Sequence, residues 1–383
     1  MRMIARARRP IMILAACALV LAGVGVALAQ ATSTSHSLRR NSIQSLLASM
    51  TLQQKVGQMM MVSFAGTTLS PQAKAMIQQV QPGGITLFGD NFSSPAQLAS
   101  LDAATQRASR VPLIISVDQE GGEVIRITSG VKQLPSEYAY GRQDDPSLVR
   151  SDAATEAKQL RRLGINMNLA PVLDIASQSS IIGEYDRSYG PTSSLVTSLG
   201  LAAIKGYQSN GVAATAKHIV GLGTTSVDPE TTLPYLDFTA TELANLLSPF
   251  KAAAKAGVDG IMVTHVVLNG VTGKNTPASL SHKVVTGILR QQFAYNGVIM
   301  TDSLTMGAVT SRFGLPTACR MAVGAGEDIL LIAAGGETQT NLYQECVNSV
   351  VDFVNAGKAS MNQIDESVTR ILTLKQKLGL KLP

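Results

Sequence analysis

The sequence predicts an α/β fold in which eight parallel strands close into a (β/α)₈ barrel. Three observations support this fold. The chain has 383 residues, which suits one such barrel with extensions. From residue 42 onward, short apolar runs alternate with longer segments of helical spacing. Charged residues and histidines follow directly after several of these runs, where barrels of this kind place their functional groups.

The apolar runs are continuous rather than alternating, which is typical of parallel strands that are covered on both faces. We expect the eight strands at Gly57–Phe64, Gly84–Phe88, Leu113–Asp118, Ile165–Asp174, Ala213–Ile219, Gly260–Val266, Gly297–Asp302 and Asp328–Ile332. An open, doubly wound sheet is the alternative. It is disfavoured because no G-x-G-x-x-G sequence follows the first strand.

Segments with helical spacing separate these strands. The clearest are Pro71–Val80, Ser147–Leu163, Thr192–Asn210 and Thr239–Ala256. Two more helices are expected after the eighth strand, near Gln339–Ala356 and Met361–Leu378. The sequence therefore predicts a single catalytic barrel domain over residues 42–383, with two extra C-terminal helices.

The N-terminus has the pattern of an export leader. A basic start precedes an uncharged apolar run over residues 11–29, and Ala27-Leu28-Ala29 forms a small-x-small cleavage site. We favour a signal peptide over residues 1–29, followed by a Ser/Thr-rich linker over 30–41. An uncleaved membrane anchor is the alternative, because the run is long enough to span a bilayer. We expect a secreted or extracytoplasmic protein in either case.

Charge and cysteine content limit the other possibilities. The formal net charge is +6, but four arginines within the first nine residues contribute four of these charges, so that only +2 would remain without the leader. We therefore expect no nucleic-acid partner. Without the leader, two cysteines remain, Cys319 and Cys346. They could pair in an exported protein or lie apart as buried thiols, and the sequence leaves both possibilities open.

Polar side chains stand at the carboxyl ends of the predicted strands, which meet at one mouth of a barrel. They are Asp118, Asp174, Lys217, His218, His265 and Asp302. Two carboxyl groups with flanking hydrogen-bond donors are the pattern of glycoside hydrolysis. Asp174 is interpreted as structural, and His265 as either a supporting residue or a substrate contact. No residue cluster has metal-ligand spacing, so we expect neither a metal nor a cofactor.

Several motifs in a fixed order resemble the single-domain β-N-acetylhexosaminidases of glycoside hydrolase family 3. They are GGITLFGDNF (83–92), SVDQEGGEVIRI (116–127), APVLDI (170–175), IIGEYDRSYG (181–190), AKHIVGLG (216–223), VTHVV (263–267), PASLS (277–281), GVIMTDSLTMGA (297–308) and IDESVTRILTLK (364–375). This resemblance implies that Asp302 is the nucleophile that forms a glycosyl-enzyme intermediate. It implies that Asp118, Arg187, Lys217 and His218 bind the sugar.

The chain departs from the family pattern in the loop after Lys217 and His218. Relatives typically have G-H-G and then D-S-H there, with the last histidine as general acid/base. This chain has Gly221-Leu222-Gly223 and then Asp228-Pro229-Glu230. We expect Glu230 to replace the histidine, with Asp228 helping to raise its pKa, and an acidic pH optimum. An inert loop glutamate is the alternative. Glu123 also stands where the motif usually has arginine.

The sequence thus predicts a retaining exo-glycosidase that removes terminal β-N-acetylglucosamine, from peptidoglycan fragments in peptidoglycan turnover or from chitin oligomers. The missing histidine keeps two alternatives open. One is a β-glucosidase-like exo-glycosidase of the same family, and the other is a catalytically degenerate barrel that only binds glycans. We expect a monomer whose partner is its carbohydrate substrate.

Overall fold

The computed structural model describes residues 42–333 and 339–383, so the expected leader and linker lie outside the described residues. A parallel sheet forms the centre of the molecule. Its strands are β1 (Met60–Val62), β2 (Gly84–Leu87), β3 (Ile114–Val117), β4 (Met167–Asn168), β5 (Ala213–Ile219), β7 (Gly260–Val263), β9 (Val298–Thr301) and β10 (Leu330–Ile332). They pair in the order β10-β1-β2-β3-β4-β5-β7-β9.

The sheet closes on itself between β9 and β10. Met300 forms a parallel bridge with Ile329, and the N–H of Thr301 donates to the Ile329 carbonyl at 3.0 Å. Every residue of the eight strands is buried, as expected for parallel strands that are covered by helices. The prediction of a (β/α)₈ barrel is therefore confirmed.

Strand positions agree with the sequence prediction, although most strands are shorter than expected. The bounds of β5 match the prediction at both ends. The first strand starts late because Gly57 and Gln58 end the preceding helix, α2 (Leu52–Gln58). That helix begins with a capping box between Thr51 and Gln54, which satisfies backbone N–H groups at its first turn.

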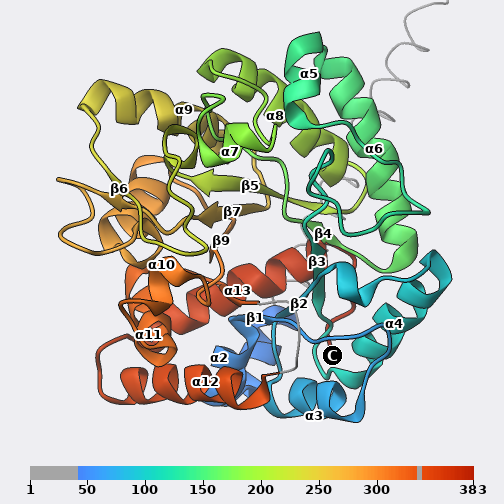
Figure 1. Ribbon diagram of the computed structural model, residues 1–383. Helices are drawn as coiled ribbons and strands as arrows, with labels where there is room; N and C mark the ends of the chain where they lie inside the picture. The colour runs from blue at the N-terminus through green and yellow to red at the C-terminus, as the bar shows by residue number, and fades with distance from the viewer. Residues whose placement is uncertain (1–41, 334–338) are drawn as a thin grey trace, which may run out of the picture.

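Helices surround the barrel (Figure 1). The longer ones between strands are α3 (Pro71–Val80), α4 (Pro95–Ala108), α6 (Pro146–Leu163), α8 (Ser193–Gln208), α9 (Ala240–Lys255), the π-helical η4 (Lys283–Gln292) and α11 (Leu315–Ala325). Short helical turns occupy the loops: η1 (Gly89–Asn91), α5 (Glu137–Gln143), α7 (Ile181–Glu184), η2 (Leu222–Thr224), η3 (Ala278–Leu280) and α10 (Gly307–Thr310).

The two C-terminal helices have different places. Helix α12 (Thr340–Asn355) contacts α11, α2, α3 and β1, and so takes its place in the ring. Helix α13 (Met361–Lys377) lies across the bottom of the barrel. Its Lys375 donates to Gln58 at 2.7 Å and its Lys377 pairs with Asp259 at 2.6 Å, and both partners stand just before strands. Of these two C-terminal helices, α13 is the one additional to the barrel ring, and it leaves the carboxyl ends of the strands open.

A disulfide joins α11 to α12. Cys319 and Cys346 are bonded, with their Cα atoms 5.9 Å apart. Of the two alternatives that the sequence left open, the structure contains the disulfide. Within residues 42–333 and 339–383, no helix has the length and apolar character that crossing a membrane requires.

A two-stranded parallel ribbon that the sequence analysis did not predict lies outside the barrel sheet. It consists of β6 (Tyr235–Leu236) and β8 (Val267–Leu268). These strands come from the segments that follow β5 and β7, respectively. The ribbon therefore ties together two loops at the carboxyl end of the barrel.

Candidate active site

A pocket of about 210 Å³ opens where the carboxyl ends of the barrel strands meet. Seven of the eight side chains predicted for the site line it. Its charged and histidine side chains are Asp118, Glu120, Arg126, Arg187, Lys217, His218, Asp228, Glu230 and Asp302. The structure thus brings together residues from the ends of β3, β5 and β9 and from the loops after β4 and β5.

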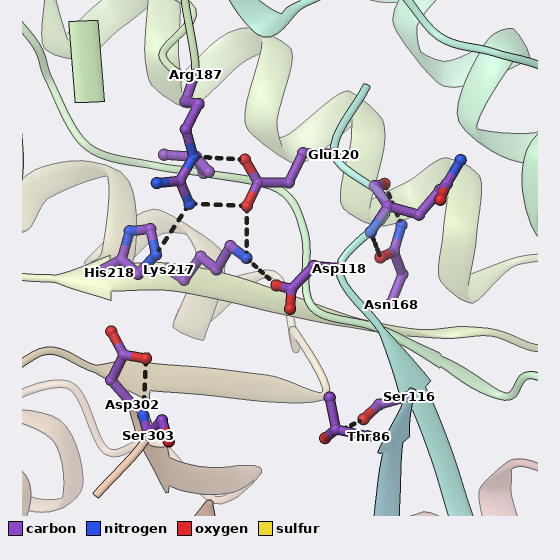
Figure 2. Close-up of polar contacts among 12 residues, drawn as sticks. Thr86, Ser116, Asp118, Glu120, Asn168, Arg187, Lys217, His218, Asp302 and Ser303 are labelled. Carbon is purple, nitrogen blue, oxygen red and sulfur yellow. Dashed lines mark hydrogen bonds and ion pairs between the residues drawn. The ribbon is translucent and has the colours of Figure 1, made fainter. Parts of the chain in front are cut away.

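A chain of ion pairs forms one wall of the pocket (Figure 2). The buried ammonium of Lys217 contacts Asp118 Oδ1 at 2.5 Å and Glu120 Oε1 at 2.6 Å. Arg187 donates to both carboxylate oxygens of Glu120, each at 2.8 Å. A two-point contact of this kind fixes the plane of the guanidinium as well as its position. The network holds two cations rigidly beside the space for a substrate.

Electrostatics keep this network charged. Burial by itself would raise the pKa of Glu120, but Arg187 and Lys217 together hold that pKa well below its usual range. Burial would likewise lower the pKa of Lys217, yet Asp118 and Glu120 raise it above the ordinary lysine value. The donors therefore carry their charges before a substrate arrives, and no reorganisation is needed.

Asp174 orients His218. Its Oδ2 accepts the backbone N–H of His218 and also the ring Nδ1–H, both at 2.9 Å. The other ring nitrogen, Nε2, lies 3.5 Å from a terminal nitrogen of Arg187 and faces the pocket. This arrangement agrees with the structural role that the sequence predicted for Asp174.

The loop after β3 presents Asp118 and Glu120 because its backbone is held on both sides. Asn168 at the end of β4 accepts the N–H of Gln119 at 3.0 Å and donates to its carbonyl at 2.8 Å. The next turn needs Gly121, whose φ of 96° is rarely adopted by residues with a side chain. A Cβ there would lie 2.5 Å from the Pro135 carbonyl.

Asp302 follows β9 and points into the pocket. Its N–H donates to the Val263 carbonyl at 2.9 Å, and its Oδ1 accepts the N–H of Ser303 at 2.8 Å. These bonds fix both the backbone and one carboxylate oxygen. In Figure 2, Asp302 lies across the pocket from Lys217.

His265 does not line the pocket, and the prediction that it binds substrate is corrected. The ring is fully buried and uses both nitrogens within the protein. Because a carbonyl can only accept, Nε2–H donates to the Ser303 carbonyl at 2.9 Å, and Nδ1 accepts from the Ser279 hydroxyl at 2.7 Å. Burial lowers the pKa of His265, which favours this neutral form. His265 therefore supports the turn that carries Asp302.

Glu230 and Asp228 stand on the loop that follows β5. Asp228 Oδ1 accepts the N–H of Glu230 at 2.9 Å, which shapes the turn. Glu230 itself is exposed at the pocket edge. Partial burial, followed by the negative charges of Asp302 and Asp228, raises the pKa of Glu230 above the ordinary glutamate value.

Glu120, Arg126 and Phe88 are among the lining side chains that the sequence analysis did not select. The guanidinium of Arg126 lies 6.0 Å from the centre of the Phe88 ring, and its buried Nε has no hydrogen-bond partner among the described residues. Glu120 and Arg126 both belong to the segment SVDQEGGEVIRI, so the motif contained the signal. Within the described ranges, no group of His, Cys, Asp and Glu side chains could hold a metal ion.

Comparisons with known proteins agree with this geometry. The model of the glycosyl hydrolase family 3 N-terminal domain matches residues 51–374. The chain belongs to glycosyl hydrolase family 3. Among family members, β-hexosaminidase A of Pseudoalteromonas piscicida is 32% identical over 338 residues, which cover 82% of this chain and 56% of that protein. The β-hexosaminidase of Nitrosomonas eutropha is 33% identical over 71% of this chain and 80% of its own length.

A solved family 3 structure has the same fold. The β-N-acetylglucosaminidase from Paenibacillus sp. str. FPU-7 is 39% identical, with a TM-score of 0.83 over 87% of this chain and 63% of that one. The chain therefore spans somewhat less than two thirds of this protein and of the Pseudoalteromonas relative, but most of the Nitrosomonas one. Family membership, which the sequence motifs predicted, is confirmed.

Proposed function

We propose that this family 3 chain is a retaining exo-glycosidase that removes terminal β-linked N-acetylglucosamine from glycans. One observation carries the proposal: Asp302 and Glu230, from separate loops, line the same pocket as the Asp118–Lys217–Glu120–Arg187 network. The pocket, about 210 Å³, is smaller than the roughly 300–1,000 Å³ of sites for drug-sized ligands, which suits a single sugar residue. The names of the relatives support N-acetylglucosamine as that sugar.

In the first step, the Asp302 carboxylate attacks the anomeric carbon and the bond to the leaving oxygen breaks. Glu230, as a carboxylic acid, donates its proton to that oxygen. In the second step, the Glu230 carboxylate removes a proton from water, whose oxygen attacks the anomeric carbon and releases Asp302. The raised pKa of Glu230 supports this assignment, because the acid must hold its proton in the free enzyme.

The wall of ion pairs has a binding role in this proposal. Charged donors on Lys217 and Arg187, with His218 beside them, bind the hydroxyl groups of the sugar, and Asp118 accepts hydrogen bonds from others. Because Glu120 fixes Arg187 and Lys217 together, the donors keep their positions as the sugar ring distorts toward the transition state.

Trapping of the covalent intermediate tests the nucleophile. An activated fluorosugar that slows hydrolysis of the intermediate should add one glycosyl mass, located on the peptide that contains Asp302. Asp302→Asn should lose turnover and labelling while still binding the sugar. Labelling of another residue, or full activity of Asp302→Asn, would refute the assignment.

A comparison of leaving groups tests Glu230. Natural disaccharides need protonation of the leaving oxygen, and activated aryl glycosides need little. Glu230→Gln should therefore lower kcat/KM far more for the disaccharide than for the aryl glycoside. Glu184→Gln, at an exposed glutamate, is the control. Equal losses on the two substrates would count against Glu230 as the acid.

We also propose that the protein is exported. The leader pattern supports this, and so does the buried disulfide between Cys319 and Cys346, because disulfides persist mainly in oxidising compartments. Cleavage of the leader is tested by N-terminal sequencing of the protein from its producing cells. A protein that keeps residues 1–29 and sediments with membranes would instead be anchored.

A further inference from the structure

The loop that carries Glu230 is attached to the turn that follows Asp302. The N–H of Gly307 donates to the Glu230 carbonyl at 2.8 Å, and the N–H of Ala308 donates to the Pro229 carbonyl at 3.0 Å. These two donors begin α10, whose N-cap residue makes no side-chain capping bond. Since the first N–H groups of a helix have no partner inside it, the loop carbonyls act as the cap.

The approach of the two segments leaves no room for a side chain at position 307. A Cβ on Gly307 would lie 2.6 Å from the Thr231 carbonyl oxygen and 2.7 Å from that of Glu230. Both contacts involve backbone atoms, which cannot rotate away as the end of a side chain can. Any larger residue at 307 must therefore push the Glu230 loop and α10 apart.

The same loop is held on its apolar side. Leu233, Val267 and Ala308 form a small buried cluster that is separate from the main core. Just beyond Leu233, the N–H of Val267 donates to the Pro234 carbonyl at 2.8 Å, and Tyr235 pairs with Val267 in the β6–β8 ribbon. The backbone of the loop is thus held by α10 and by the ribbon, while the Glu230 side chain stays free to meet a substrate.

We propose that Gly307 is a positioning residue that holds the loop of the proton donor in place against the turn of the nucleophile. The turn from Asp302 to Gly307 carries the carboxylate at its start and the backbone donor to the Glu230 loop near its end. Displacement of the Glu230 loop from this turn therefore misplaces the proton donor, while Asp302 keeps its own bonds to Val263 and Ser303. This catalytic consequence rests on the proposed function, whereas the attachment of the loop does not.

Gly307→Ala tests the proposal, with Gly314→Ala as the matched control. Gly314 likewise stands at the start of a helix, as the N-cap residue of α11, and a Cβ added there meets nothing within 4 Å. Hydrogen–deuterium exchange of the full chain should show faster exchange over residues 228–236 in Gly307→Ala, and no change there in Gly314→Ala. This readout needs no turnover, so that it judges the attachment of the loop even if the proposed substrate is wrong.

Kinetics test the catalytic consequence. Because a misplacement of about 1 Å can cost up to about a hundredfold in rate, Gly307→Ala should lower kcat/KM for N,N′-diacetylchitobiose about tenfold or more. The loss on 4-nitrophenyl β-N-acetylglucosaminide should be less than about threefold, because that leaving group needs little protonation. Azide should partly restore kcat on the aryl substrate, because this anion attacks the glycosyl-enzyme without a base.

Leu233→Ala is a second variant, because it loosens the apolar side of the loop without a steric clash. It should show the same preference for the activated substrate to a smaller extent. The proposal is overturned if Gly307→Ala exchanges like the parent over residues 228–236. It is also overturned if kcat/KM of the variant falls equally for both substrates. If the parent chain hydrolyses neither substrate but Gly307→Ala shows the faster exchange, the proposed function is rejected and the attachment of the loop is supported.

Discussion

Glu120 accepts two hydrogen bonds from Arg187, both at 2.8 Å, and its Oε1 also contacts the ammonium of Lys217 at 2.6 Å. One buried carboxylate thus neutralises two cations, of which Lys217 lies in β5 and Arg187 in the loop after β4. Both cations line the pocket beside Glu120, so the geometry of the proposed sugar site depends on this carboxylate.

Glu120→Gln should therefore lower both stability and sugar affinity. Loss of the charge leaves Arg187 and Lys217 without their shared partner, and breaking a buried ion pair costs about 3–5 kcal/mol. Urea unfolding measures the free energy of unfolding, and KM for an aryl glycoside measures the site. Glu123→Gln, at an exposed glutamate of the same motif, is the control and should change neither.

The Glu120 contribution should also depend on pH. Because the pKa of Glu120 is lower in the folded protein, its stabilisation is present above the ordinary glutamate pKa of about 4.3 and is lost as the pH falls below it. Unfolding free energies of the parent and Glu120→Gln should thus converge on acidification. A difference that stays constant down to strongly acidic pH would contradict the assigned charge.

Asp228→Asn should move the alkaline limb of the kcat/KM profile to lower pH. Asp228 is one of the negative charges that raise the pKa of Glu230, and activity on a disaccharide falls as pH rises through that pKa. Asparagine keeps the oxygen that accepts the Glu230 N–H, so the turn is preserved. An alkaline limb that stays in place, with normal folding, would show that Asp228 does not tune Glu230.

Asp174→Ala should weaken sugar binding through His218. The variant removes the acceptor for both the ring N–H and the backbone N–H of His218. Hydrogen bonds to charged groups contribute about 1.5–3 kcal/mol, so KM should rise about tenfold or more. Asp174→Asn, which keeps an acceptor oxygen, should recover most of this loss. If both variants show the same KM, sugar binding does not depend on the orientation of the His218 ring.

Removal of the disulfide should destabilise the barrel without altering its site. Cys319 and Cys346 are separated by 27 residues, and closing a loop of that size is worth about 3–4 kcal/mol in the chain-entropy model. The double variant Cys319→Ala/Cys346→Ala should have a lower Tm and an unchanged KM. Thermal unfolding with and without reductant checks the parent chain. If the Tm of the parent chain stays the same when reductant is present during unfolding, this expectation is contradicted.

The sequence predicted the barrel well because its strands are continuous apolar runs and its helices start at recognisable signals. Ser70 and Ser94, for example, cap α3 and α4 directly before a proline. Most of the pocket could be predicted for a related reason. Lys217 lies near the end of β5 and Asp302 directly follows β9, and the carboxyl ends of parallel barrel strands converge on one mouth.

The missed features depend on contacts between segments that are far apart in sequence. Glu120 is important because it meets Lys217 from β5 and Arg187 from the loop after β4, which no local pattern shows. His265 stands near a strand end as Lys217 does, yet its ring is buried and donates to the Ser303 carbonyl beside Asp302. The attachment of the Glu230 loop to α10 uses backbone hydrogen bonds, and the glycine at 307 does not by itself show which segment approaches it.

The most direct test of the account is hydrolysis of a panel of 4-nitrophenyl β-glycosides by residues 42–383 and by the full chain, between pH 4 and 8. The account predicts turnover of the β-N-acetylglucosaminide above all others. With N,N′-diacetylchitobiose as a parallel substrate, it predicts activity that declines toward the alkaline end because Glu230 loses its proton. Preference for a β-glucoside would assign the chain to a different sugar. No turnover of any glycoside by well-folded protein would contradict the central claim, since Glu230 would then not replace the missing histidine.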